Sequence, residues 1–182
     1  MLPNDPGHGV APDLASRELS RSTELEIRML ASLLISLVGG QRAMTPLATV
    51  AVASARGELP ADNGAPGILS HPLIGAGAAM LAAGEIAGDK QKTAPDRVVP
   101  IGLAARFVTS AITGAALAPR KDRWLGAAVG GLTAVAASYP GWRARMAALG
   151  RYGQTLTGFV EDAIVLAGAA AIVRSCGKPA TA

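Results

Sequence analysis

Large aromatic side chains are scarce in this sequence. Its 182 residues include two Phe, two Tyr and two Trp, so aromatics make up only 3% of the chain. A water-soluble core of this size usually depends on such side chains for much of its buried area. Half of the residues are nevertheless hydrophobic, and the mean hydropathy is +0.34. Most of them are small, and small residues let helices approach closely in lipid, so the composition favours a membrane protein.

Cysteine and histidine are also rare, which removes several kinds of chemistry. Cys176 is the only cysteine, so no intrachain disulfide can form. With two His in addition, the chain lacks the ligands for a zinc site built from nitrogen and sulfur alone. The sequence contains no P-loop, no Gly-x-Ser-x-Gly and no His-Glu-x-x-His motif. We therefore predict no metal and no cofactor, and we do not favour an enzyme.

Positive charge is present but is not concentrated. Lys and Arg number 17 against 13 Asp and Glu, which gives a net charge of +4. The charged residues form short clusters between apolar runs, without the basic stripe and stacking aromatics of a nucleic-acid-binding surface. We therefore expect no nucleic-acid partner. Solvated loops and the positive-inside rule of membrane proteins explain the basic residues better.

Five apolar segments have about the ~20 residues that a membrane span requires. They predict an all-α polytopic transmembrane helical bundle of about five spans over residues 26–175. We expect a disordered polar tail at 1–25 and a C-terminal tail at 176–182. The segments are residues 27–55, 68–86, 98–118, 124–142 and 156–173.

The first segment is too long for one straight span, since a helix over 27–55 would measure roughly 43 Å. Gly39, Gly40 and Pro46 bracket Gln41 and Arg42. Glycine pairs and proline are common causes of sharp helix bends. We therefore expect the first helix to be kinked or broken near Gly39–Arg42.

Lysines and arginines flank the five segments unevenly. If the N-terminus is inside, nine of them lie on the inner side and six on the outer side, which favours this orientation. The predicted inner set is Arg17, Arg21, Arg28, Lys90, Lys92, Arg97, Arg143, Arg145 and Arg151. The predicted outer set is Arg56, Arg120, Lys121, Arg123, Arg174 and Lys178.

Two Gly-x-x-x-Gly pairs occur within the apolar segments. They are Gly84 with Gly88 and Gly126 with Gly130. Such pairs allow close helix contacts, either within one chain or between two. In a chain with 22 glycines the signal is weak, and packing within the monomer is the favoured interpretation.

A short pattern occurs twice. Arg42-x-x-Thr45-x-x-x-Thr49 in the first segment matches Arg106-x-x-Thr109-x-x-x-Thr113 in the third. On a helix these positions share one face. The pattern is either coincidence or a parallel repeat of two-helix units, and transporters often contain weak internal repeats.

Arg42 and Arg106 lie inside segments that are otherwise apolar. An ionisable side chain at membrane depth is costly, so it usually has a partner. Helical rise places both about 21 Å from one face, in the inner third of the bilayer if the N-terminus is inside. Four acids of two other segments fall at a similar level. In the predicted cluster Arg42 and Arg106 pair with Glu85 and Glu161, Thr45 and Thr109 are hydrogen-bond partners, and Asp89 and Asp162 extend toward the cytoplasmic interface. The candidate binding or ion-pair cluster is therefore Arg42, Thr45, Glu85, Asp89, Arg106, Thr109, Glu161 and Asp162.

Several of these residues resemble a known family. The stretch 39–47 (GGQRAMTPL), the stretch 84–90 (GEIAGDK), Pro95, the run from Pro100 to Arg106, and Glu161-Asp162 are similar to small bacterial integral membrane proteins that share domain of unknown function 4126. The resemblance covers roughly residues 27 to 175. It implies a bacterial source and a multi-pass protein of the inner membrane, with no activity, substrate or cofactor to transfer.

Three functions fit the predicted polar cluster. The leading hypothesis is transport of a small solute or ion along the cluster. The alternative is a non-catalytic membrane scaffold or accessory subunit, whose glycine-rich faces would bind a partner helix or a second copy. The third is a membrane-embedded enzyme that acts on lipid head groups. In each case the lipid bilayer is the expected surrounding.

Overall fold

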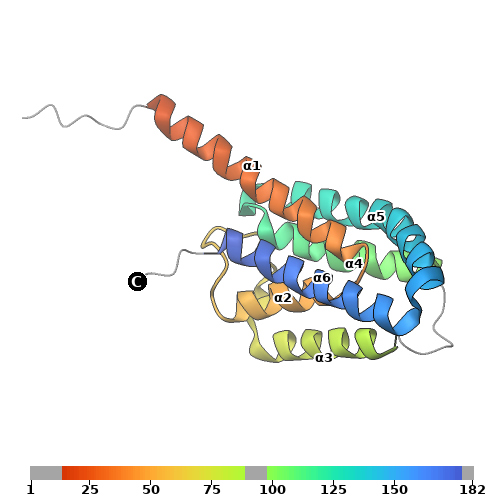
Figure 1. Ribbon diagram of the computed structural model, residues 1–182. Helices are drawn as coiled ribbons and strands as arrows, with labels where there is room; N and C mark the ends of the chain where they lie inside the picture. The colour runs from red at the N-terminus through yellow and green to blue at the C-terminus, as the bar shows by residue number, and fades with distance from the viewer. Residues whose placement is uncertain (1–13, 89–97, 178–182) are drawn as a thin grey trace, which may run out of the picture.

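The computed structural model describes residues 14–88 and 98–177 and is entirely helical (Figure 1). The all-α prediction is therefore confirmed, with six helices in the described part where the sequence predicts about five spans. Among them, α4 and α6 are long and apolar enough to cross a membrane. The helices are α1 (Leu14–Gly39), α2 (Met44–Ala55), α3 (Pro72–Gly88), α4 (Pro100–Leu117), α5 (Arg123–Tyr152) and α6 (Gln154–Cys176), with 3-10 turns η1 (Gly67–Ser70) and η2 (Arg120–Asp122).

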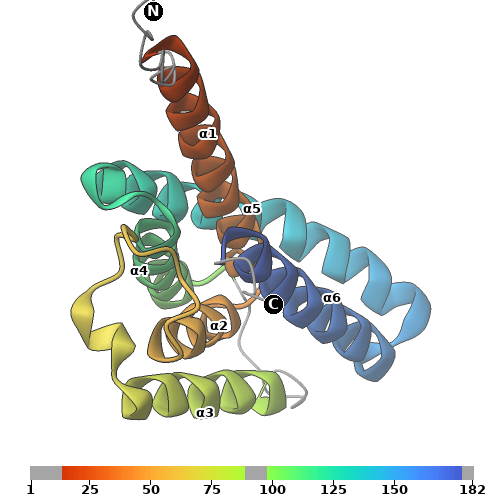
Figure 2. The ribbon, with the colours of Figure 1, turned by 90° about the vertical axis from the view of Figure 1, so that its left-hand side faces the viewer.

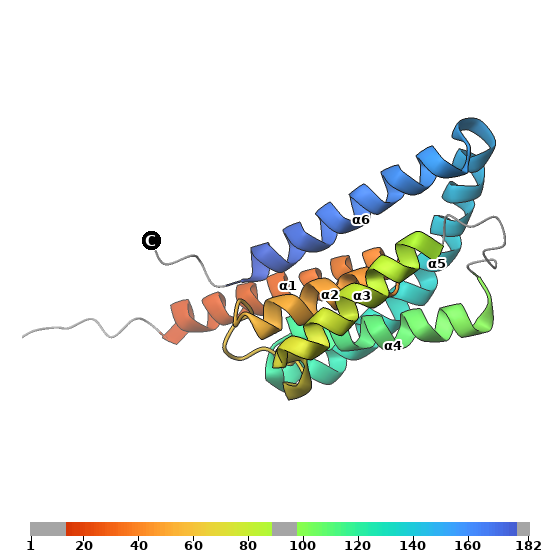
Figure 3. The ribbon, with the colours of Figure 1, turned by 90° about the horizontal axis from the view of Figure 1, so that it is seen from below.

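The first apolar segment forms two helices. α1 ends at Gly39, and α2 begins at Met44 after the chain has turned back on itself (Figures 1 and 3). The predicted break is confirmed, but it reverses the chain rather than bending one span. Gly40 is required here, because a Cβ on it would lie 2.8 Å from the carbonyl oxygen of Ala134 on α5.

The predicted disordered tail is wrong for residues 14–25, which form the first turns of α1. This polar part of α1 projects beyond the other helices (Figure 2). Its residues are exposed but follow directly into the apolar part, and extending an existing helix adds one hydrogen bond per residue fixed. Glu24 also lies 4.0 Å from Arg28, one turn later on the same face.

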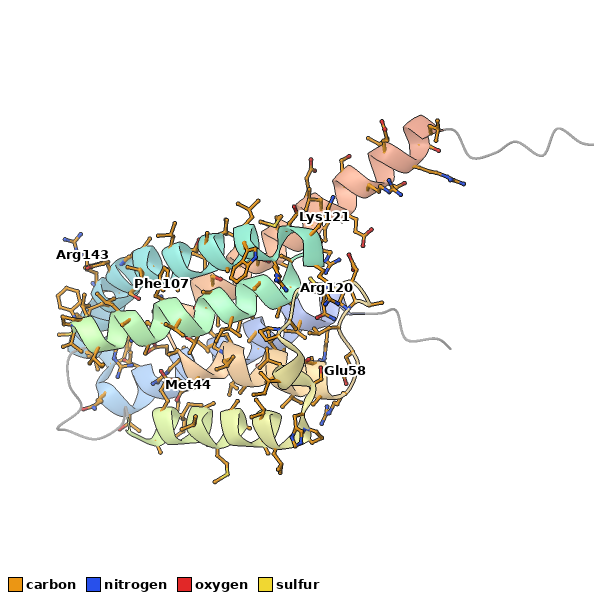
Figure 4. All side chains as sticks on the ribbon, turned by 180° about the vertical axis from the view of Figure 1, so that it is seen from behind. Met44, Glu58, Phe107, Arg120, Lys121 and Arg143 are labelled. Atoms are coloured by element: carbon orange, nitrogen blue, oxygen red, sulfur yellow. The ribbon has the colours of Figure 1, made fainter. Side chains whose placement is uncertain are left out.

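Each helix runs back along the one before it, so the bundle has two distinct ends (Figures 1 and 3). We call the end where α1 begins and α6 finishes the terminal end. The opposite end, with the α1–α2 reversal and the α5–α6 turn at Gly153, is the turn end. Arg120, Lys121 and Glu58 lie at the terminal end, and Arg143 lies at the turn end (Figure 4).

The extra reversal changes the predicted sidedness. Arg28 on α1 contacts the carbonyl oxygens of Leu117 and Ala118, next to Arg120. The predicted inner and outer sets of basic residues therefore do not correspond to the two ends. Among the described residues outside the predicted site, the terminal end carries Arg17, Arg21, Arg28, Arg56, Arg120, Lys121, Arg123 and Arg174, and the turn end carries Arg143, Arg145 and Arg151.

Glycines bring α4 and α5 into close contact. A Cβ added at Gly126 would lie 2.6 Å from the carbonyl oxygen of Gly114. A Cβ added at Gly130 would overlap the carbonyl oxygen of Ser110. This Gly-x-x-x-Gly pair therefore packs within the monomer, as predicted. Gly84 and Gly88 on α3 behave differently, since nothing lies within 4 Å of a Cβ at either position.

The interior is unusually polar and the exterior unusually apolar. Buried hydroxyls lie along α1, α4 and α5, for example Ser32 and Ser36, which are 0% exposed. Meanwhile Met80 on α3 is 76% exposed and Ile101 on α4 is 79% exposed.

The helix that corresponds to the predicted segment 124–142 is longer than predicted. α5 contains Pro140 and Trp142 and ends at Tyr152.

Adding a methyl group at the α4–α5 contact should destabilise the bundle. We expect Gly130→Ala to lower the free energy of unfolding by about 1–3 kcal/mol, because the Ser110 carbonyl belongs to a helix backbone that has little room to move. Gly84→Ala is the matched control, since it adds the same group to open space in a helix. Thermal unfolding in detergent measures both. Equal melting temperatures for the two variants would contradict the close α4–α5 contact.

Candidate functional site

Arg42 forms a buried ion pair with Asp162. Arg42 lies between α1 and α2, and its Nη2 donates to Oδ1 of Asp162 on α6 at 2.6 Å. The two side chains are 2% and 7% exposed. At this burial the loss of hydration is costly, and removing one partner would leave the other charge without compensation. The pair therefore ties α6 to the α1–α2 reversal.

Asp162 belongs to the predicted cluster, but its expected direction toward the membrane interface is wrong. It lies instead on the packed face of α6, in line with three other buried residues, Val165, Ala169 and Val173. Their spacing of three and four residues defines a single helix face. This spacing is the sequence signal that would have identified Asp162 rather than Glu161 as the acid directed into the bundle.

Glu161 is bound by a residue that was not predicted to belong to the site. Its Oε2 accepts a hydrogen bond from Nη1 of Arg145 on α5 at 2.6 Å. The Arg145 side chain is 10% exposed and the Glu161 side chain is 16% exposed. Adjacent residues on a helix point about 100° apart, so Glu161 and Asp162 contact different neighbours. Together the two acids attach α6 to α5 and to the α1–α2 reversal.

Glu85 binds the backbone at the start of α2. Its two carboxylate oxygens accept hydrogen bonds from the amides of Ala43 and Met44, both at 2.9 Å. The first amides of a helix have no partner within the helix, and the helix dipole favours a negative charge near them. Glu85 therefore acts as a cap supplied by α3, at the same level as Arg42 and Asp162.

The remaining predicted residues have different settings. Arg106 is buried in the second turn of α4, 6% exposed. The Thr109 hydroxyl donates to the Ala105 carbonyl oxygen of its own helix at 2.9 Å, so its strongest described bond is not to an arginine. Thr45 is 1% exposed, and its hydroxyl has no hydrogen-bond partner among the described residues. Asp89 lies outside the described residues.

A third buried arginine, Arg28, lies outside the predicted site, because its sequence position indicates a flanking charge. It is 3% exposed, and its Nε and Nη2 donate to the carbonyl oxygens of Leu117 and Ala118 at 3.1 and 3.0 Å. Its Nη1 also donates to Oδ1 of Asp62 at 2.5 Å. A cation there satisfies the free carbonyls at the C-terminus of α4. Arg28 therefore caps the C-terminus of α4 at the terminal end, and Glu85 caps the N-terminus of α2 at the turn end.

A cleft of about 730 Å³ opens beside the ion pairs. α6 diverges from the bundle toward the α5–α6 turn (Figure 3). The cleft lies between α5, α6 and the end of α1. Its lining is mostly apolar, with Arg145 and Glu161 in one wall and Gln41 next to the reversal. The Arg42–Asp162 pair itself does not line the cleft.

Comparisons with protein families, with curated proteins and with solved structures find no match to this chain. The resemblance noted in the sequence therefore stays a prediction. Within residues 14–88 and 98–177, no group of three or more His, Cys, Asp or Glu side chains is placed to hold a metal ion.

Breaking the Arg42–Asp162 pair from one side should destabilise the protein strongly. We expect Arg42→Met alone to lower the free energy of unfolding by about 3–5 kcal/mol, because it leaves a carboxylate buried. Arg42→Met combined with Asp162→Leu should recover most of that loss, since it removes both charges. Arg56→Met is the control, because Arg56 lies 3.8 Å from Glu58 in a pair that is more than half exposed. A double variant no more stable than Arg42→Met would contradict the coupling.

Proposed function

We propose that the protein resides in a membrane as a multi-pass helical bundle. The exposed surface supports this, since its large apolar side chains would be poorly placed in water but well placed in lipid. The buried polar groups support it as well, because helices in lipid associate through close packing and hydrogen bonds rather than through hydrophobic contrast. α2 has 12 residues, about 18 Å of helix, which is too short to cross alone.

We further propose that both termini face the cytoplasm. The terminal end carries eight of the eleven basic residues given above for the two ends, and the positive-inside rule places such an end in the cytoplasm. The orientation of the N-terminus is the one predicted from sequence. The polar site, however, then lies toward the outer face instead of the inner third, because the chain reverses once more than predicted.

Labelling of single cysteines tests this orientation. In a Cys176→Ser background, a cysteine at Gly150 should react with a membrane-impermeant maleimide applied outside intact cells. A cysteine at Gly57 should react only after the cells are opened. Both glycines are exposed and have open space around the Cβ position, so the two cysteines are matched in accessibility. Gly57 has a φ of 67°, which disfavours a side chain, so thermal unfolding of Gly57→Cys checks that this variant folds. Labelling of Gly57→Cys from outside would reverse the orientation, and labelling of both from outside would contradict the bundle as a membrane-crossing unit.

Within the membrane, we propose that the protein acts as a non-catalytic scaffold that pairs with a second copy through α3. The outer face of this helix carries the proposal. A Cβ added at Gly77, Gly84 or Gly88 would have nothing within 4 Å. Glu85 is the one charged residue of α3, and it is directed toward the start of α2 as a cap. Spacings of seven and four residues place these glycines on one face, where another helix could approach closely. Glu85 is occupied as a cap, so this geometry gives lipid head-group chemistry little support.

Self-association in vesicles tests the scaffold. We expect wild-type protein at low density in phosphatidylcholine vesicles to form dimers, measured by energy transfer between labelled copies. Gly84→Leu should weaken the dimer about tenfold, which corresponds to about 1.4 kcal/mol, because the added side chain keeps the two helix backbones apart. Gly150→Leu, which fills open space on α5, should leave dimerisation unchanged. A monomeric wild type would contradict pairing through α3.

Transport of a small solute or ion is the second candidate. One observation favours it: the cleft extends to Gln41, directly beside Arg42. The sealed Arg42–Asp162 pair favours the scaffold instead, because a carrier needs water or solute to reach its charges. The same vesicles separate the two. Ion or solute flux that is lost in Arg42→Met/Asp162→Leu, with dimerisation intact, would support transport. Flux equal to that of protein-free vesicles would support the scaffold.

A further inference from the structure

The two long walls of the cleft have opposite character. On α5 the wall includes a stripe of small residues, Ala137, Gly141, Ala144 and Ala148, with Pro140, Arg145 and Tyr152 beside it. On α6 the wall includes Leu156, Val160 and Ile164. Both sets follow spacings of three or four residues, so each forms a straight stripe along its helix. Small residues opposite large aliphatic ones leave an elongated hollow, and neither stripe has a packing partner that fills it.

The dimensions of the hollow fit a single extended chain. Leu156 to Ile164 spans about 12 Å along α6, and Ala137 to Ala148 spans about 16 Å along α5. α1 supplies the floor through Leu37. A solute with polar groups along its length would lose hydration here without finding hydrogen-bond partners. A hydrocarbon chain would lose nothing of that kind, and the aliphatic stripe gives it close contacts.

Charge at the turn end indicates what the other end of the occupant carries. From Gly141 to Val160 the chain contains three arginines, at positions 143, 145 and 151, and no carboxylate. Arg143 and Arg151 are exposed, and Figure 4 shows Arg143 at the turn end. Glu161 is the nearest acid in the wall, and Arg145 already binds it at 2.6 Å. Neither Arg143 nor Arg151 lines the cleft, but this stretch makes the neighbourhood of the α5–α6 turn positive, which favours an anion there.

We infer that this cleft holds one acyl chain of an anionic phospholipid from the surrounding bilayer. The chain lies between the α5 and α6 stripes, and the phosphate lies toward Arg143 and Arg151. This inference rests on the proposed membrane location, but it does not depend on pairing through α3. The divergence of α6 then has a role, because it leaves a cleft that an acyl chain of the bilayer fills.

Fluorescence quenching by brominated lipids tests the site. Trp124→Phe leaves Trp142, next to Gly141 of the lining, as the sole tryptophan. The protein is placed in phosphatidylcholine vesicles that contain increasing fractions of phosphatidylglycerol with brominated acyl chains. We expect half-maximal quenching at a fraction about tenfold lower than with brominated phosphatidylcholine, because the two exposed arginines attract the anionic head group.

Two pairs of variants identify the source of the preference. Arg143→Gln/Arg151→Gln should abolish it, whereas Arg120→Gln/Lys121→Gln removes the same charge at the terminal end and should not. Ala144→Leu fills the hollow and should reduce quenching by both lipids, whereas Ala136→Leu on the exposed side of α5 should not. Ala148→Leu repeats the first test if Ala144→Leu fails to fold.

The outcomes separate this inference from the membrane proposal. Protein that inserts and is quenched equally by the two lipids has only ordinary lipid contacts, and the inference is overturned. Quenching that is unchanged in a folded Ala144→Leu or Ala148→Leu variant also overturns it. Protein that fails to float with the vesicles contradicts the membrane location itself.

Discussion

The reversal between α1 and α2 is the constraint on which the rest of the bundle depends. A helix that starts inside the structure exposes amides that have no partner within the helix. In lipid no water would satisfy them, so non-helical backbone is tolerated only where protein surrounds it. Glu85 supplies acceptors for the amides of Ala43 and Met44, and its charge also suits the positive end of the α2 dipole. α3 is thereby fixed against α2 by the very groups that the reversal leaves unsatisfied.

Arg42 extends the same logic to α6. The reversal buries a guanidinium, and Asp162 compensates it from a helix that otherwise diverges from the bundle. Arg28 satisfies the end of α4 in a corresponding way, through the carbonyl oxygens of Leu117 and Ala118. Arg28, Arg42 and Glu85 thus act where helices begin or end, bound to backbone or to a buried acid. Such an arrangement explains their presence without an open pathway, which is why the scaffold is the better-supported function.

The sequence was sufficient for the helical class, the break near Gly39–Arg42 and the internal packing of Gly126 and Gly130. Each of these depends on local composition or on spacing along one helix. The partner of Arg42 was missed because Glu161 and Asp162 are adjacent, and only the direction of the packed face of α6 distinguishes them. The helical start at Leu14 was missed because a polar stretch looks the same whether it continues a helix or not. The reversal at Gly40 depends on close contact with α5, far away in the chain.

One additional reversal has a consequence for every later residue. A kinked span would leave residues after Ala55 on the opposite side from the N-terminus, whereas two antiparallel helices return them to the same side. Arg56 and Arg120 then join Arg17 and Arg21 at the terminal end. The same change moves Arg42, Glu85 and Asp162 toward the opposite face. The orientation of the N-terminus and the depth of the polar site are therefore separate questions, and the four residues between α1 and α2 connect them.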